Sequence, residues 1–272
     1  MSDHLYLAPR SKAALVWRSV AGLSALTLAV SSCSSGDDGE EAGSSEASDA
    51  PSTIVLINPN SNEDSTQSMV DLAEEEAGDQ ANVVGVSNEA APPLLTTPQD
   101  MEDAASGVVD LGIEAAEDDD VAAIIVSAFS DPGLEELRDE VDIPVFGIGE
   151  EAFHAAARDG REFGIVTITP DEDLVESFQE KADSLGYADQ YHGVQVTPGD
   201  PDEIVESPDE LDEALADAVR ESVSSDGSEA VIMGGGPLSG PALRIEGQFE
   251  EPLVVAVVAA VDAALEEVGS AA

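Results

Sequence analysis

The chain has 272 residues, of which 59 are Asp or Glu and only nine are Lys or Arg, so its formal net charge at pH 7 is −50. A charge of this sign and size repels nucleic acid and anionic membrane surfaces, and neither is an expected partner. We attribute the acidity to solubility in high salt and expect no metal site, because the acidic residues are spread along the chain and no Asp/Asn/Gly loop of the calcium-binding type is present.

The N-terminal segment predicts export. Three basic residues precede a short apolar run at 19–30, which is too short for a permanent membrane span of about 20 residues. The run leads into Val-Ser-Ser-Cys, which ends at Cys33, the only cysteine of the chain, and resembles the lipobox of bacterial lipoproteins. This resemblance implies a signal peptide at 1–32 and a lipid anchor on Cys33 at the extracytoplasmic face of the cell membrane. The alternative is an incidental thiol behind an ordinary signal peptide.

The rest of the chain divides into a tether and a folded part. Residues 33–52 consist mainly of Ser, Gly, Ala, Asp and Glu, which predicts a disordered tether. From residue 53 onward, apolar β-branched runs alternate with helical patterns, as in parallel sheets covered by helices. The expected strands are 53–57, 82–86, 121–127 and 143–148 in the first half, and 163–168, 193–196, 229–233 and 252–257 in the second.

The two halves of the folded part resemble each other. The segment IVLINP at 54–59 is followed 111 residues later by IVTITP at 165–170. The Pro-Val-Phe that begins at Pro144 is followed 108 residues later by the Pro-Leu-Val that begins at Pro252. Two matches at nearly one spacing indicate a duplicated unit. We therefore predict an α/β fold of two similar Rossmann-like lobes with parallel sheets, related by a pseudo-twofold axis.

The lobe boundaries place the expected ligand site. The first lobe is expected at 53–158 and the second at 159–268. Ligands of open α/β sheets bind at the carboxyl ends of the strands. A ligand cleft is therefore expected between the lobes, where the carboxyl ends of both sheets meet.

One pair of turns that would line this cleft follows the first strand of each half. Asn58 and Ser61 lie in the first of these turns, where backbone amides and short polar side chains suit a carboxylate or carbonyl oxygen. Plain turn and capping chemistry is the alternative, since Ser61 and Asp64 have capping-box spacing at a helix start. The counterpart at 169–172 carries similar signals, with Pro170 expected at the first helical position.

A second pair of turns follows the third strand of each half, at 127–133 and at the glycine-rich segment 234–240. Glycines directly after a strand let another group approach the backbone closely. A phosphate cradle is a weak alternative, because neither segment fits a Walker or dinucleotide pattern. The residues that we expect to bind substrate are Asn58, Ser61, Ser127, Phe129, Ser130, Thr167, Gly234 and Gly236.

These segments resemble the aspartate/glutamate/hydantoin racemase superfamily, and its hydantoin racemase branch most closely. The matching pieces are INPNS at 57–61, FSDPGL at 129–134, PVFGIGEEA at 144–152, FGIVT at 163–167 and the glycine turn at Gly234. The resemblance covers 53–268 and implies a cofactor-free isomerase that acts on a small amino-acid-like or hydantoin-like substrate. Members of the family exchange the proton on a carbon beside a carbonyl or carboxylate, using two cysteines on opposite faces.

The chain departs from this family at the two cysteines. Counting back from Pro144 and Pro252, the family's cysteine positions fall on Ala128 and Gly235. Neither residue can carry a proton, and Cys33 comes too early in the sequence to replace them. The two-thiol mechanism is therefore not expected here.

Two functions stay open. The first is a racemase or isomerase, or a related lyase, that works without thiols, with His154 and Asp131 as weak candidates for an acid or base. A structural role is the alternative for both: His154 lies in a helix expected at 150–158, and Asp131 is expected to serve its own turn and helix start. The second is a catalytically inactive surface lipoprotein that binds a small carboxylate or amide. Either function implies a small-molecule ligand, no cofactor and membrane contact only through the anchor, and leaves a homo-oligomer open.

Overall fold

The computed structural model describes residues 51–95, 98–235 and 238–271, which belong to one compact unit. Two four-stranded sheets make up this unit, and every strand pairing in them is parallel. The strand orders, β2-β1-β3-β4 and β6-β5-β7-β8, repeat one topology in the two halves of the chain. The predicted α/β fold of two similar lobes is therefore confirmed.

The first sheet and its helices comprise β1 (Ser52–Asn58), α1 (Glu63–Ala77), β2 (Ala81–Ser87), α2 (Pro98–Ala116), β3 (Val121–Val126), α3 (Leu134–Glu140), β4 (Val145–Gly147) and α4 (Ile148–Ala156). After the short helix η1 (Arg158–Gly160), the second comprises β5 (Phe163–Thr167), α5 (Glu172–Ser184), β6 (Tyr191–Val196), α6 (Pro201–Val205), α7 (Pro208–Ser224), β7 (Ala230–Met233), α8 (Ser239–Ile245), η3 (Glu246–Gln248), β8 (Leu253–Val255) and α9 (Ala256–Ala271). All eight predicted strands are present, and no strand end differs from its prediction by more than two residues.

Equivalent backbone hydrogen bonds recur in the two lobes. The N–H of Asn88 donates to the carbonyl of Asn58, and the N–H of Thr197 donates to that of Thr167, both over 2.9 Å. Each of these bonds extends the pairing of the lobe's first two strands by one residue beyond the sheet. The resemblance of the halves thus extends from the sequence to individual contacts at the carboxyl ends of the strands.

Two predicted helix starts are wrong. Helix α1 is capped by Asn62, whose side-chain oxygen accepts from the N–H of Ser65 over 3.1 Å, and not by Ser61. Helix α5 is capped by Asp171, which accepts from Leu174 over 2.9 Å, so Pro170 precedes the helix instead of opening it. In both turns several residues that favour capping stand side by side, and sequence spacing alone did not select among them.

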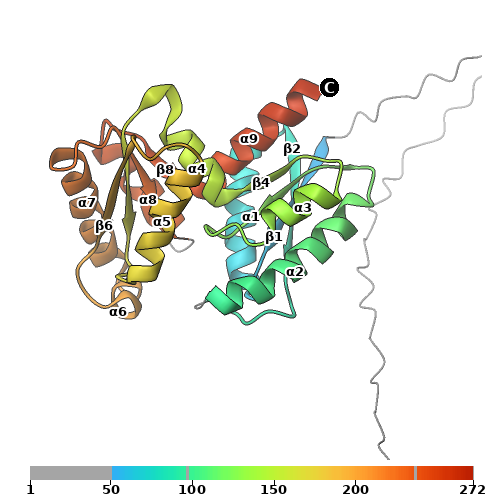
Figure 1. Cartoon of the computed structure of the whole chain (residues 1–272), viewed down its shortest axis with the longest axis horizontal. Helices are drawn as coiled ribbons and strands as arrows, with labels where there is room; N and C mark the ends of the chain where they lie inside the picture. The colour runs from blue at the N-terminus through green and yellow to red at the C-terminus, as the bar shows by residue number, and fades with distance from the viewer. Residues whose placement is uncertain (1–50, 96–97, 236–237, 272) are drawn as a thin grey trace, which may run out of the picture. The chain divides into compact units, whose positions relative to one another are not determined.

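The last helix of each half packs against the other half. Helix α9 contacts α1, β3 and β4 of the first lobe, while α4 contacts β7 and β8 of the second, and the two helices run side by side (Figure 1). The largest group of buried apolar residues accordingly draws on both halves of the chain. Each lobe also has a core of its own, between β1, β3 and α2–α3 in the first and between β7 and α7–α8 in the second. A shared core therefore joins the two lobes, beside the core that each lobe has of its own.

Aromatic residues gather in this shared core, although they make up only 4% of the chain. Phe153 of α4 is fully buried, and its ring lies 5.6 Å from that of Phe163 in β5 and 6.2 Å from that of Tyr191 in β6. It also contacts Phe129, with 6.1 Å between the ring centroids. A residue that belongs to the first half by sequence therefore packs mainly on strands of the second.

Within the described ranges, no helix combines the length and the apolar character that crossing a bilayer requires. The predicted signal peptide, Cys33 and the tether up to residue 50 lie outside the described residues, as does the predicted site residue Gly236. The tether was predicted one residue too long, because Ser52 already pairs in β1.

We predict that Phe153→Ala lowers the free energy of unfolding by about 3–5 kcal/mol, because the substitution leaves a cavity in the core that joins the lobes. Phe249→Ala is the matched control, since Phe249 is half-buried and packs at the edge of a single lobe, near Arg220. Its loss should be less than half as large. Urea denaturation of both variants checks this, and equal losses would contradict the role given to Phe153.

Candidate functional site

The two turns predicted to carry the family's cysteine positions are structurally equivalent. The N–H of Ser127, just after β3, donates to the carbonyl of Ile57 over 2.8 Å. The N–H of Gly234, just after β7, donates to that of Val166 over 2.9 Å. The next residues are Ala128 and Gly235, so these two occupy matching places at the carboxyl ends of their sheets.

Phe178 of α5 links the two turns. Its ring packs edge-on against Phe129, the neighbour of Ala128, with 5.4 Å between centroids. Its Cζ atom also lies 3.8 Å from the place where a Cβ atom at Gly234 would stand. The turn of the first lobe and the turn of the second therefore both approach a single aromatic ring.

Gly235 adopts a backbone conformation with φ of +143°. L-amino acids rarely adopt this region, because the Cβ atom clashes with the backbone. The local structure at Gly235 therefore suits glycine and disfavours any side chain there, including cysteine.

Polar side chains after β1 bond within their own turn. Asn58 is 1% exposed, and its amide donates to the side chain of Asn60, the carbonyl of Asn62 and the hydroxyl of Thr66, over 2.9–3.2 Å. The backbone N–H groups of Asn60 and Asn62 are in turn bonded by side-chain oxygens. The amide of Asn58 is thus bonded within the turn, and its role in ligand binding stays a prediction.

The remaining predicted binding residues differ in accessibility. Ser127 and Thr167 are buried; the Ser127 hydroxyl donates to the Ile57 carbonyl over 2.9 Å, and that of Thr167 accepts from the Thr169 N–H over 3.3 Å. Ser61 is half-buried and Ser130 is exposed. Of these four residues, Ser130 is the exposed one, and it lies in the same turn as Ala128.

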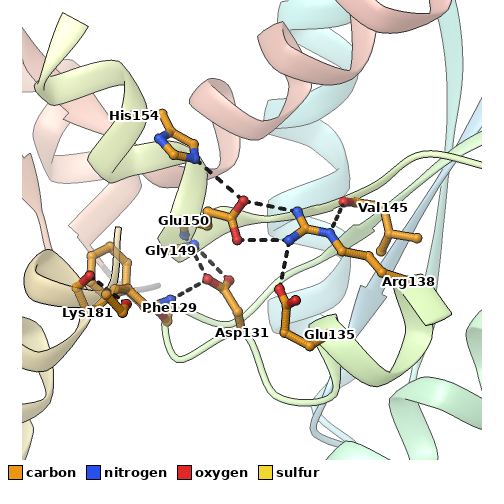
Figure 2. A network of polar contacts seen from close by, with 10 residues as sticks. Phe129, Asp131, Glu135, Arg138, Val145, Gly149, Glu150, His154 and Lys181 are labelled. Atoms are coloured by element: carbon orange, nitrogen blue, oxygen red, sulfur yellow. Dashed lines mark hydrogen bonds and ion pairs between the residues drawn. The ribbon is translucent and has the colours of Figure 1, made fainter. Parts of the chain in front are cut away.

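The 127–133 turn contains a buried carboxylate, that of Asp131. Its two oxygens accept from the N–H groups of Gly149 and Glu150, over 2.9 and 2.7 Å, at the first turn of α4, and one of them also pairs with Lys181 of α5 (Figure 2). The expectation that Asp131 serves its own helix start is wrong, since the cap of α3 is Gly133. Burial raises the pKa of Asp131, and Lys181 and the two amides oppose that shift.

Beyond this carboxylate the network continues along α4. Glu150 accepts two hydrogen bonds from the guanidinium of Arg138, over 3.0 and 3.1 Å, and lies 3.5 Å from Nε2 of His154 (Figure 2). The other ring nitrogen of His154 lies 2.7 Å from the hydroxyl of Tyr187. His154 is therefore held at both nitrogens by neighbouring side chains.

These contacts shift the pKa values of Glu150, Glu151 and His154. The hydrogen bond with His154, together with Arg138, lowers the pKa of Glu150 to about 2 against the effect of burial. The same hydrogen bond raises the pKa of His154, supported by the charge of Glu151 and opposed by burial and by Arg138. Burial raises the pKa of Glu151. The contact therefore favours the imidazolium form of His154 and the carboxylate form of Glu150.

Among the described residues, Glu150, Glu151 and His154 form a group with metal-ligand potential, since one ligand atom from each lies within 4.8 Å of the others. Arg138 already occupies Glu150 with two hydrogen bonds, and its positive charge opposes a cation at this place. We therefore assign no metal to the group.

Two surface hollows lie away from the paired turns. One of about 440 Å³ is lined by residues around β4 with Arg138 and Glu267, and one of about 320 Å³ lies between α5 and β6. Neither is lined by Ala128 or Gly235. The ligand cleft between the lobes stays a prediction.

Three residues of the site were missed by sequence reasoning: Phe178, Lys181 and Tyr187. All lie in or just after α5 and reach across to the first half of the chain. One signal was available for Lys181, because the chain has only one other lysine, Lys12.

We predict that His154→Gln destabilises the protein more at low pH than at high pH. A raised pKa means that the folded state holds the proton more tightly, so the contribution is complete below about pH 6.5 and is lost as pH rises through the folded pKa. Solvent screens this half-exposed pair, so the effect should not exceed about 1 kcal/mol. Melting temperatures of both proteins from about pH 5.5 to 9 check this; a constant difference would contradict it.

Comparison with known proteins gives the family. The Asp/Glu/Hydantoin racemase family matches residues 54–267. A hydantoin racemase of Paenarthrobacter aurescens is 24% identical over 207 residues, covering 76% of this chain and 87% of the relative. A hydantoin racemase of Pseudomonas sp. is 27% identical over 145 residues, and this match spans only 57% of that protein and 53% of this chain.

Solved structures share the fold. Allantoin racemase from Klebsiella pneumoniae superposes with a TM-score of 0.74 at 24% identity, covering 81% of this chain and 89% of that one. The two parallel sheets of the structure are consistent with this similarity, and the family match extends over nearly the whole folded part. The chain therefore belongs to the Asp/Glu/hydantoin racemase family.

Proposed function

We propose that this racemase-family protein binds a small hydantoin-like or amino-acid-like molecule at the turns that carry Ala128 and Gly235. The relatives named above are hydantoin racemases, and the similar structure is an allantoin racemase. Hydantoin and allantoin share a five-membered ring with two amide groups, so a ligand of this kind presents carbonyl oxygens and N–H groups in a plane.

Backbone amides of the paired turns support this ligand class. Among the described residues, the N–H groups of Ala128, Phe129, Ser130 and Gly235 have no hydrogen-bond acceptor. The turn after β1 differs, because its amides are bonded by Asn58, Asn60 and Asn62. Donors without a protein acceptor, placed at the carboxyl ends of strands, suit the carbonyl or carboxylate oxygens of a small ligand.

The side chains at positions 128 and 235 favour ligand binding over catalysis. Racemisation needs one group to remove a proton and a second to return it from the other face. Ala128 and Gly235 offer no such group, and the nearby Asp131 is buried and bonded by three donors. We infer that ligand capture without thiol chemistry is the primary function.

One observation keeps an isomerase as the second candidate. His154 is a half-exposed imidazole with a raised pKa, and Glu151 beside it is a carboxyl with a raised pKa. Shifted pKa values of this kind occur at acid–base sites as well as in structural networks. A thiol-free isomerase would draw on these two side chains.

Deuterium incorporation separates the two functions. We predict that the full chain, incubated in heavy water with single enantiomers of 5-methylhydantoin, allantoin or aspartate, leaves the stereocentre without deuterium above the uncatalysed rate. One of these compounds should raise the melting temperature, as a ligand that binds only the folded state does. Exchange that disappears in His154→Gln would establish the isomerase instead. Neither exchange nor a thermal shift with any compound would contradict both functions.

We also propose that the protein is a lipoprotein of the extracytoplasmic membrane face, anchored through Cys33. The support is the Val-Ser-Ser-Cys sequence behind a charged and then apolar segment. Mass spectrometry of the membrane-extracted chain should find Cys33 as the N-terminal residue, carrying two or three acyl chains. Cys33→Ser should release the protein from the membrane fraction. An unmodified thiol, or full release of the wild-type protein by high salt, would contradict the anchor.

A further inference from the structure

We propose that Lys181 is a positioning residue for the ligand site: it holds the turn at Ala128 in its binding conformation from the other lobe. This inference rests on the proposed function, which places the ligand at that turn. Lys181 lies in α5, and the turn follows β3 in the first half of the chain.

Lys181 makes two contacts with the turn. Its Nζ atom pairs with the carboxylate of Asp131 and donates to the carbonyl oxygen of Phe129 over 3.3 Å (Figure 2). The side chains of Lys181 and Asp131 are only 19% and 4% exposed. One ammonium group therefore fixes both the carbonyl next to Ala128 and the end of the turn, in surroundings where solvent screens little of the interaction.

The conformation of the turn depends on such support. Asp131 has φ of +52°, which is uncommon for a residue with a side chain. Three groups hold its carboxylate: the N–H groups of Gly149 and Glu150, and Lys181. The turn also lies directly on α4, since a Cβ atom at Gly149 would overlap the carbonyl oxygen of Phe129. Of the three groups, Lys181 alone comes from the second half of the chain.

Helix α5 presents two side chains to the turn from one face. Phe178 and Lys181 are three residues apart, a spacing that places them side by side on a helix. Phe178 packs against the ring of Phe129, while Lys181 bonds its carbonyl oxygen. Phe178 also approaches Gly234. Movement of α5 would therefore change the position of Phe129 relative to the glycine turn.

Composition supports a specific role for this residue. The chain contains 59 acidic residues and two lysines, Lys12 and Lys181. A lysine that served solubility would extend into solvent, whereas Lys181 is largely buried against one carboxylate. Lys181 is thus the single lysine of the folded part, and it lies at the predicted ligand site.

The test compares Lys181→Met and Lys181→Arg with the wild-type full chain at the same salt concentration. Deuterium uptake of the segment 127–133, in which the N–H groups of Ser127 and Asp131 are hydrogen-bonded and report on the turn, is measured by mass spectrometry. The Kd for 5-methylhydantoin and for allantoin is measured alongside. Lys181→Met should speed uptake in this segment and weaken binding roughly tenfold. This is the lower end of the loss in metal affinity when a residue that orients a metal ligand is replaced. Lys181→Arg should restore most of both properties. Arg220→Met, which breaks the exposed pair with Asp217, should leave both unchanged.

A double variant keeps the test decisive if Lys181→Met does not fold. Lys181→Met with Asp131→Asn removes the unpaired buried charge and should still show faster uptake at 127–133 and weaker binding. Unchanged uptake and unchanged Kd in a variant that merely melts earlier would overturn the positioning role. If the wild-type chain binds neither compound, the proposed function fails, and uptake at 127–133 alone decides whether Lys181 holds the turn.

Discussion

The Asp131 carboxylate joins three segments that lie far apart in the sequence. It ends the turn after β3, accepts two hydrogen bonds at the start of α4, and pairs with Lys181 of α5. A buried carboxylate is stable only when its charge is matched by donors, and here two amides and one ammonium supply them. The place of Ala128 relative to the second lobe depends on this arrangement, because Phe129 is held by the same lysine and by Phe178.

The shared core holds the two lobes together, so that the contact between Lys181 and Asp131 can fix the turn of one lobe relative to the other. Helices α4 and α9 each pack on the sheet of the opposite half, and the aromatic rings around Phe153 fill the space between α4, β5 and β6. Rigid packing of this kind limits how far the turns at Ala128 and Gly235 can separate. The family fold is retained, and neither Ala128 nor Gly235, the positions that we predict for the family's cysteines, can carry a proton. The backbone at position 235 has a positive φ, which favours glycine over any residue with a side chain.

Local patterns predicted the strands well and the site contacts poorly. Runs such as 54–57 and 123–126 are apolar and β-branched, so their identity as buried strands follows from composition. Capping at Asn62 and Asp171 was missed because neighbouring residues have similar capping strength. The partners of Asp131 lie 18, 19 and 50 residues away, and only the tertiary fold brings them together. Glu150 and Tyr187 contact both ring nitrogens of His154, a pair of contacts that no sequence pattern indicated.

Amide chemical shifts provide the most direct test that the paired turns form the ligand site. Titration of the isotope-labelled full chain with 5-methylhydantoin, followed by ¹H–¹⁵N correlation spectra, reports each backbone N–H separately. If the turns bind the ligand together, the largest shifts should fall on residues 128–130 and on Gly235, at one common Kd. Shifts confined to one lobe, or to the hollow beside Arg138 and Glu267, would contradict a shared site at the two turns.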